Sequence, residues 1–460
     1  MIVQHNLQAM NANRMLGTTK KSQAKATEKL SSGLQINRAA DDAAGLSISE
    51  KMRKQIRGLD QASTNAQDGI SSVQTAEGAL TEVHSMLQRM NELAVQASNG
   101  TNSESDRQSI QDEIDQLTTE IDRVAETTKF NETYLLKGNG KKATLTVGAK
   151  DAGIEGSLRG VGTGSAVFVM DKLKSAEQIT IGSKGYTIGT AMATVTAAVT
   201  GAAGTKITIN GTEYEIATNT ASEDETANKY TKETLQSFVN EGAKVTVGNT
   251  TYVAATMTGG VSNNDASIID ETKAYALIKD ELKKASSVGT DAGSEASVGD
   301  VSTNANYGAK KAHFTITEGK VETKQGLQLS LHVGADADEN NKIAVTIDTM
   351  DSAGLGVKGL NVVDNTGAKA TYAIDAIADA VAKVSETRSA LGAVQNRLEH
   401  TIANLDNVVE NTTSAESQIR DTDMAEEMVN FSKNNILAQA GQAMLAQANT
   451  STQGVLSLLG

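Results

Sequence analysis

The sequence of 460 residues contains no cysteine, no proline and no tryptophan, and aromatic residues make up only 3% of it. Without cysteine, disulfides, thiol catalysis and cysteine-ligated zinc or iron–sulfur sites are excluded. The absence of proline favours long uninterrupted helices, because proline removes a backbone donor and clashes with the preceding turn. No run approaches the roughly 20 apolar residues of a membrane-spanning helix, so we expect no membrane insertion.

Acidic residues outnumber basic ones, 56 to 42, so the formal net charge is −14. A nucleic-acid binder needs a basic face that releases counterions, so nucleic acid is not an expected partner. The same balance argues against a polybasic membrane-surface role. Residues 1–6 lack the basic region and apolar core of a secretory signal peptide. We therefore expect a cytoplasmic protein or one exported without a cleaved signal.

The C-terminal part carries a long helical seam in which apolar residues recur every three or four positions, with Arg388 in the one missing position. Its members are Ile374, Ile377, Val381, Val384, Leu391, Val394, Leu398, Ile402, Leu405 and Val409. The N-terminal part has matching stripes, which are Ile110, Ile114, Leu117, Ile121 and Val124, and more loosely Ile70, Val73, Leu80, Val83, Leu87 and Met90. This spacing is typical of long helices packed on other helices.

Turn signals divide these helical parts. A break is expected at residues 31–33, a helix start after residues 41–42, a turn at 99–103, and a helix over about 105–127. A long helix should begin near Thr371, and a last one should cover about 417–447. We predict an α+β chain whose N- and C-terminal segments pair as a long antiparallel, coiled-coil rod. The rod carries a β-hairpin-rich insert.

In the insert, alternation replaces the helical period, and one pattern occurs at residues 178–188, 206–216 and 244–254. Each copy has a Thr between two β-branched residues, then a turn, and a Tyr seven positions after the first β-branched residue. Asn210 and Gly211 indicate a hairpin, because both tolerate positive φ. We predict three hairpins, the second and third followed by helices at about 222–240 and 267–284, as a repeated unit. Residues 327–348 should form a further hairpin.

A search for catalytic and metal-binding patterns points to none. No two of the five histidines form the H-E-x-x-H pair of zinc proteases, and there is no phosphate-binding loop or nucleophile elbow. Asp336, Asp338 and Asn340 imitate the first ligands of a calcium loop, but Asn341 and Ile347 replace its Gly and Glu. We interpret this stretch as a solvated turn and predict no enzyme, cofactor or metal.

Several long motifs resemble bacterial flagellins. At the N-terminal end these are residues 30–46 (LSSGLQINRAADDAAGL), 65–70 (NAQDGI) and 76–80 (AEGAL). At the other end, residues 388–398 (RSALGAVQNRL) and 415–425 (AESQIRDTDMA) resemble the flagellin C-terminal helices. The resemblance covers roughly residues 1–137 and 325–460, while the ITIN-type repeats of the insert are only weakly similar to a short motif of some flagellar proteins.

The resemblance implies a structural subunit that polymerises into the hollow helical flagellar filament for swimming motility. It implies export through the flagellar type III channel, with an export chaperone and the cap and hook-associated proteins as partners. The implied inner tube is residues 1–44 and 416–460, the helical rod is 45–140 and 325–415, and the solvent-facing insert is 141–324. The inner-tube packing residues would be Leu7, Met10, Leu16, Leu437, Met444, Leu445, Leu456 and Leu459. The rod core would include Leu391, Val394, Leu398, Ile402, Leu405, Val409, Ile110, Ile114, Leu117 and Ile121.

A second implication concerns the animal innate receptor Toll-like receptor 5, which binds many flagellins. Residues 88–96 resemble its epitope, although Asn91 stands where many flagellins have a basic residue. The contact candidates are Arg89, Glu92, Leu93 and Glu113. Alternative readings are a hook–filament junction protein, an enzyme carried on the insert, and adhesion or glycan display by the Ser/Thr-rich insert. The match at both ends favours the filament subunit.

Overall fold

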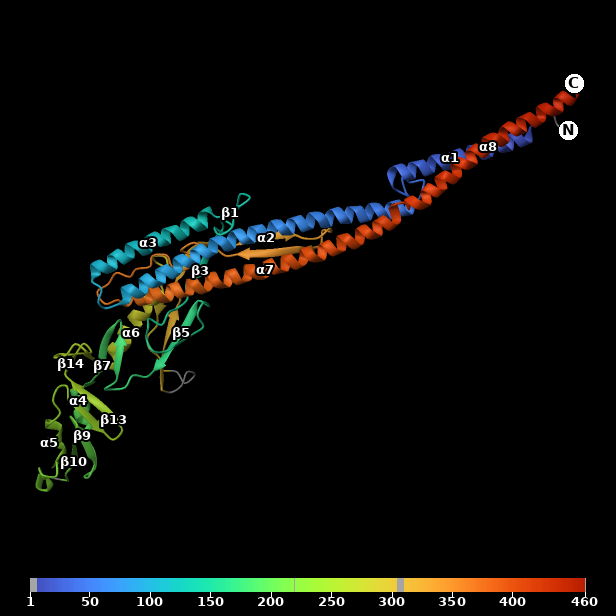
Figure 1. Cartoon of the computed structure of the whole chain (residues 1–460). Coiled ribbons are helices and arrows are strands. Elements are labelled where there is room, and N and C mark those ends of the chain that lie inside the picture. The colour runs from blue at the N-terminus through green and yellow to red at the C-terminus, as the bar shows by residue number, and fades with distance from the viewer. Residues whose placement is uncertain (1–5, 219, 304–309, 460) are drawn as a thin grey trace. The chain divides into compact units, whose positions relative to one another are not determined.

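The computed structural model describes residues 6–218, 220–303 and 310–459, and their side chains except those of residues 221 and 452–459. The helices are α1 (Leu7–Ser32), α2 (Ala43–Ser98), α3 (Glu104–Thr127), α4 (Met192–Ala198), α5 (Lys232–Ser237), α6 (Glu271–Ser286), α7 (Ala368–Arg420) and α8 (Met424–Leu459) (Figure 1). The chain is therefore mixed helix and sheet with long terminal helices and a sheet-rich middle, as the sequence predicts.

The strands concentrate between α3 and α7. They are β1 (Lys129–Phe130), β2 (Thr133–Tyr134), β3 (Lys142–Thr146), β4 (Ser157–Arg159), β5 (Ser165–Asp171), β6 (Gln178–Ile181), β7 (Lys184–Ile188), β8 (Thr190–Ala191), β9 (Lys206–Ile209), β10 (Thr212–Ile216), β11 (Lys229–Tyr230), β12 (Lys244–Val247), β13 (Thr250–Ala255), β14 (Met257–Thr258), β15 (Val261–Ser262), β16 (Ile268–Ile269), β17 (Ser297–Val298), β18 (Lys311–Thr317), β19 (Lys320–Lys324), β20 (Leu327–His332) and β21 (Lys342–Ile347).

The chain forms two compact units. The first unit comprises Met1–Ser71, Ser330–Ala344 and Val394–Gly460, and the second comprises Ser72–Leu329 and Val345–Ala393. Helices α2 and α7 contribute to both. In the first unit their segments run antiparallel, because Arg420 pairs with Glu50 at 2.6 Å while Arg53 approaches Glu416 at 3.9 Å. The predicted pairing of the N- and C-terminal segments is thereby confirmed.

The hairpin of β20 and β21 is present where the sequence predicts it. In the first unit Val333 and Ile343 share a core with Ala66 of α2 and Leu398 of α7. A Cβ at position 69 would lie 2.4 Å from Leu331 Cδ1, so a larger residue there would displace the Leu331 side chain of the hairpin.

In the second unit, side chains of α3 fix the loop that precedes α7. Arg107 of α3 is 2% exposed and donates to the carbonyls of Ala97, Asn99 and Asp364. One turn later, Gln111 donates to the Leu360 carbonyl at 2.8 Å and accepts from the Val362 amide at 2.7 Å. These bonds satisfy carbonyls at the end of α2 and fix the loop that leads into α7.

The three predicted insert hairpins share one register. Ile179 lies opposite Tyr186, Ile207 opposite Tyr214, and Val245 opposite Tyr252. The seven-residue spacing thus reflects a cross-strand pair that puts an aliphatic and an aromatic side chain on the same face.

After each hairpin comes a helix that is directly preceded by a short strand. Strand β8 precedes α4, β11 precedes α5, and β16, which follows β14 and β15, precedes α6. In the middle copy, β11 pairs in parallel with β10 of the same hairpin. The first and third copies instead exchange strands. Strand β8 of the first copy pairs with β13 of the third, and β16 of the third pairs with β7 of the first. Chain length explains the placement of β8, because one residue separates it from β7 and leaves no room for the crossover that parallel pairing requires.

The insert contains two separate apolar clusters. In one, Val195 of α4 and Leu235 of α5 pack on the sheet that contains β9, β10 and β12. In the other, Ile278 and Leu282 of α6 pack with Phe168 of β5 and Phe314 of β18.

Three helix predictions need correction. The helix expected over 222–240 is only Lys232–Ser237, because Asp224 and Glu223 bond nearby amides and form a turn instead. Helix α6 begins after its N-cap Asp270 rather than at 267, and α4 was not predicted. The last helix does not begin at 417, since α7 continues to Arg420 and α8 starts at Met424.

Candidate assembly surface on the terminal helices

Helices α1 and α8 lie side by side and antiparallel within the first unit (Figure 1). Asn6 caps α1 by accepting from the Ala9 amide at 2.9 Å, and its amide nitrogen donates to the Ala448 carbonyl at 3.1 Å. At the other end of the pair, Lys29 lies 3.9 Å from Glu427. Helix α8 extends past the start of α1 (Figure 1).

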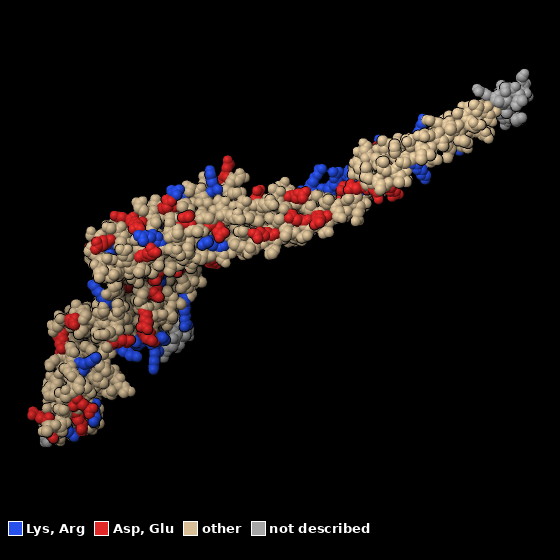
Figure 2. All heavy atoms as spheres, in the orientation of Figure 1, with Lys and Arg blue, Asp and Glu red and all other residues tan. Residues whose placement is uncertain are grey.

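Contact between the two helices buries very little. Leu16 of α1 and Ala438 of α8 are 8% and 7% exposed, and a Cβ at Gly441 would lie 3.3 Å from Leu16 Cδ1. By contrast, nine large apolar side chains of the pair are at least 46% exposed, which are Leu7, Met10, Met15, Met424, Met428, Val429, Ile436, Leu437 and Met444. Figure 2 shows a largely uncharged surface over α1 and α8 on the face drawn.

Six of these nine residues lie on two surfaces. A groove between the helices is lined by Met15 and Leu16 of α1 and by Leu437, Gly441 and Met444 of α8. A second stretch on α8 comprises Met428, Val429 and Ile436 with Ser432 and Lys433. We call the groove and this stretch together the terminal apolar surface. Contiguous exposed apolar area of this kind marks interaction sites on soluble chains.

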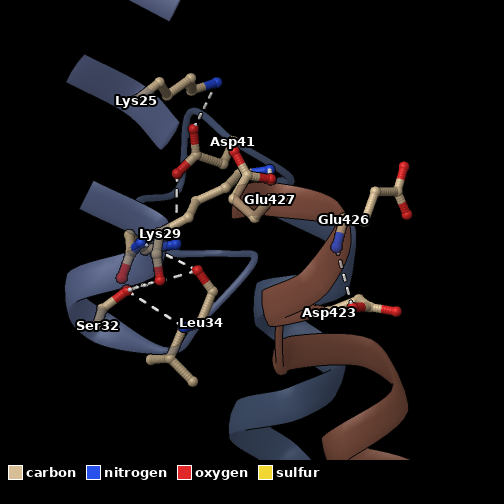
Figure 3. Close-up of polar contacts among 9 residues, drawn as sticks. Lys25, Lys29, Ser32, Leu34, Asp41, Asp423, Glu426 and Glu427 are labelled. Carbon is tan, nitrogen blue, oxygen red and sulfur yellow. Dashed lines mark hydrogen bonds and ion pairs between the residues drawn. The ribbon is translucent and has the colours of Figure 1, made fainter. Parts of the chain in front are cut away.

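The helix breaks at residues 33–42 and 421–423 lie next to each other and are joined through the main chain. The Gln35 amide donates to the Arg420 carbonyl at 2.7 Å, and the Thr422 amide donates to the Gly33 carbonyl at 3.0 Å. Gly33 ends α1 with φ 73°, a conformation that glycine adopts without a steric penalty. Asp423 accepts from the Ala425 and Glu426 amides and so caps α8 (Figure 3).

Side chains stabilise the same junction. Lys25 lies 2.8 Å from Asp41, and this hydrogen bond lowers the pKa of the Asp41 carboxyl below its usual value. The other oxygen of Asp41 accepts from the Arg38 amide at 3.1 Å. Leu34 donates its amide to Ser32 Oγ at 3.2 Å (Figure 3). The junction is thus a hydrogen-bonded structure rather than a loose linker.

Of the predicted inner-tube residues, Leu16 is buried, Leu445 is half-buried, and Leu7, Met10, Leu437 and Met444 are exposed. The side chains of Leu456 and Leu459 lie outside the described residues, although both positions belong to α8. Within a single chain, therefore, most of the described members of this set are uncovered.

The predicted rod-core residues occupy interior positions. Leu391, Leu398, Leu405, Ile110, Ile114 and Ile121 are buried, and Val394, Ile402, Val409 and Leu117 are half-buried. Their three- and four-residue spacing therefore corresponds to the inward faces of α7 and α3.

Three receptor-contact candidates form one exposed ion-pair group in the second unit. Arg89 of α2 bonds Glu113 of α3 at 2.9 Å and Glu92 at 3.1 Å, and all three side chains are about half exposed or more. Leu93 differs from the expectation of an apolar contact, because it is 2% exposed. It faces the interior because it continues the buried three- and four-residue stripe of Leu80, Val83, Leu87 and Met90.

Met15 and Val429 were not among the predicted packing residues. On α8, apolar residues are spread around the helix, so periodicity does not single out Val429. Among the described residues, no group of three or more His, Cys, Asp or Glu side chains could hold a metal ion. None of the described helices is long and apolar enough to cross a membrane.

Comparisons with known proteins agree with this architecture. Residues 3–141 match the bacterial flagellin N-terminal helical region, and residues 374–459 match the bacterial flagellin C-terminal helical region. A flagellin of Clostridium tyrobutyricum is 42% identical over 459 residues, which cover 98% of this chain and 100% of the relative. A flagellin of Halalkalibacterium halodurans is 36% identical, and the flagellar filament 31.3 kDa core protein of Treponema maltophilum is 33% identical, each over 100% of both chains. The chain therefore belongs to the bacterial flagellin family, whose members are structural subunits of the extracellular flagellar filament and not enzymes.

Proposed function

We propose that the terminal apolar surface is the contact through which copies of this chain pack in the inner tube of the filament. The observation that carries the proposal is the concentration of large exposed apolar side chains on α1 and α8. Full burial of one such side chain stabilises by about 1.5–3 kcal/mol. Burying several of them against neighbouring copies would therefore offset much of the entropy cost of association.

The direct test is a pair of polar substitutions on this surface. Leu437→Gln together with Met444→Gln leaves helix propensity nearly unchanged but places amides where apolar packing is expected. We expect the critical concentration for polymerisation, measured by sedimentation of seeded monomer, to rise at least about tenfold. Helical circular dichroism of the monomer should not change, since both side chains are already exposed.

The matched control is Val161→Gln, which alters an exposed apolar residue of the insert, 46% exposed like Leu437. It should polymerise as the parent chain does. Polymerisation of the Leu437 and Met444 variant at the parent's critical concentration would contradict the proposal, as would an equal loss in the control.

The same proposal assigns residues 1–44 and 416–460 to the inner tube, 45–140 and 325–415 to the rod, and 141–324 to the solvent-facing insert. Partners would be the export chaperone and the cap and hook-associated proteins of a flagellum, with exit through the type III channel. Removing residues 451–460 should then prevent filament growth from an intact hook but not the secretion of monomer, which can be assayed in culture supernatant.

A second proposed activity is binding of the monomer to Toll-like receptor 5. It is supported by the exposed group of Arg89, Glu92 and Glu113, which presents a fixed guanidinium between two carboxylates on α2 and α3. A fixed, multiply bonded arginine is well suited to charge-specific contacts. Leu93 is buried and is therefore not one of the proposed receptor contacts.

Binding of the monomer to purified receptor ectodomain, measured by surface plasmon resonance, tests this activity. Arg89→Ala should weaken binding at least about tenfold if the guanidinium is a central contact. Arg123→Ala is the matched control, since Arg123 also bonds an exposed glutamate of α3, Glu120. If the two variants bind the receptor with equal affinity, Arg89 is not a receptor contact.

A further inference from the structure

Among the described residues, the exposed methionines are confined to the terminal helices α1 and α8. Met10, Met15, Met424, Met428 and Met444 are 64%, 60%, 49%, 51% and 64% exposed. Elsewhere, Met90, Met170 and Met350 are at most 4% exposed, and the remaining described methionines are half-buried. Because the chain has no cysteine, methionine is its only sulfur-containing residue.

Three of these side chains belong to the terminal apolar surface, while Met10 and Met424 are exposed on the same two helices. Met15 of α1 and Met444 of α8 line the groove together with Leu16 and Leu437. Met428 lies in the second stretch with Val429 and Ile436. A change in the polarity of these sulfur atoms would therefore alter both parts of the surface at once.

We propose that Met10, Met15, Met424, Met428 and Met444 are an oxidation site that controls assembly, with hydrogen peroxide as the oxidant. Each thioether sulfur attacks one peroxide oxygen and the O–O bond breaks. The sulfur is oxidised by two electrons and gains the oxygen, and the peroxide is reduced to water. The product is a methionine sulfoxide.

Sulfoxide formation replaces an apolar, flexible side chain by a polar one with a strong acceptor and no donor. In the free chain this costs little, because the side chains already face water. In an interface the sulfoxide oxygen would lose its water without gaining a donor, which disfavours burial. Oxidised chains should therefore stay monomeric, while chains already assembled should be shielded from peroxide. This regulatory role rests on the proposed packing function of the same surface.

The experiment treats full-length monomer with graded hydrogen peroxide and maps the sulfoxides by peptide mass spectrometry. The five methionines should oxidise well before Met90, Met170 and Met350. Sedimentation of seeded monomer should then show a rise of at least about tenfold in critical concentration. Treatment with methionine sulfoxide reductases A and B and a dithiol should restore the original value, because the modification is reversible.

Two variants make the test specific. Replacing the five methionines by leucine keeps the surface apolar, so this variant should assemble after peroxide treatment. Replacing the half-buried Met52, Met86, Met192 and Met257 by leucine should leave the sensitivity intact. In preformed filaments, the five methionines should oxidise at least about tenfold more slowly than in monomer.

The outcomes separate the two proposals. Failure of the untreated parent chain to assemble would contradict the packing function, while the order of oxidation would still be read from the peptide map. Assembly of fully oxidised parent chain at its original critical concentration would overturn the oxidation proposal. It would also be overturned if reductase treatment failed to restore assembly, or if the five methionines oxidised no faster than the buried ones.

Discussion

Helices α1 and α8 leave nine large apolar side chains at least 46% exposed, whereas the insert between residues 141 and 324 leaves one among its described residues, Val161. The insert buries its apolar side chains in two clusters, one of which also includes Ala368 and Tyr372 of α7. The terminal pair leaves most of its large apolar side chains uncovered within one chain. This difference is the basis for proposing that the terminal helices, and not the insert, pack against other copies.

The largest expected effect is a loss of insert stability that leaves polymerisation unchanged. A change in polymerisation after a substitution in the insert core would contradict the difference between the two regions. Phe314→Ala removes a fully buried ring that packs edge-on against Tyr275 with ring centroids 6.0 Å apart. We expect a loss of about 3–5 kcal/mol in the stability of the insert. Thermal unfolding followed by calorimetry measures it, with the exposed Thr315→Ala as the control. The critical concentration for polymerisation should not change.

Alkaline pH should destabilise the second unit. Burial raises the pKa of Tyr275 to about 12, and burial with the hydrogen bond to Glu281 raises the pKa of Tyr372. A group whose folded pKa is raised stabilises the fold below its unfolded pKa, here near 10, and this contribution is lost as the pH rises above it. Stability of the second unit should fall between pH 10 and 12. Absorbance titration at the tyrosinate band should show Tyr275→Phe removing one late-titrating group. A titration in which all tyrosines ionise together would contradict this account.

A smaller effect is expected where α7 begins. Asp364 accepts from the Gly367 and Ala368 amides at 2.7 and 3.0 Å, so Asp364→Ala should cost about 1 kcal/mol as a lost cap. Burial opposes ionisation, but these bonds and that from Thr366 outweigh it and lower the pKa of Asp364. Its contribution is therefore fully present above pH 4 and is lost progressively as the pH falls through the lowered pKa. Urea unfolding at pH 7 and pH 3 should show a smaller cost at pH 3, while Asn365→Ala has none at either pH.

The smallest effect belongs to the ion pair of the terminal helices. Lys29 and Glu427 lie 3.9 Å apart near the protein surface, so the coupling energy from a double-mutant cycle should be below about 1 kcal/mol. A coupling energy this small would mean that apolar contacts, rather than the ion pair, mainly stabilise the packing of α1 on α8. A coupling energy of several kcal/mol would mean that charge pairing, rather than the thin apolar contact, holds α1 on α8.

Much of this architecture is predictable from local patterns. The breaks at 33 and 99–103, the antiparallel terminal pairing and all four hairpins follow from helical periodicity, turn residues and alternation. In each insert hairpin, the Tyr seven positions after the first β-branched residue lies directly opposite that residue. This spacing reflects the register, because a two-residue turn fixes which side chains are opposite.

Other features depend on contacts far apart in the sequence. Exchange of β8 and β16 between hairpins depends on linker lengths and on the neighbouring sheets rather than on the strands themselves. Neither the loop contacts of Arg107 nor the junction between Gly33 and Thr422 has a periodic signature. Burial of Leu93 was missed because the receptor epitope was transferred from a resemblance, although the helical stripe through Leu87 and Met90 pointed inward.

The most direct test of the central contrast is electron microscopy of seeded chains that lack either residues 141–319 or residues 451–460. Our account predicts uniform filaments, narrower than those of the parent chain, from the insert deletion, and soluble monomer from the terminal deletion. Filaments from the terminal deletion, or persistent monomer from a folded insert deletion, would contradict the assignment of assembly to the terminal helices.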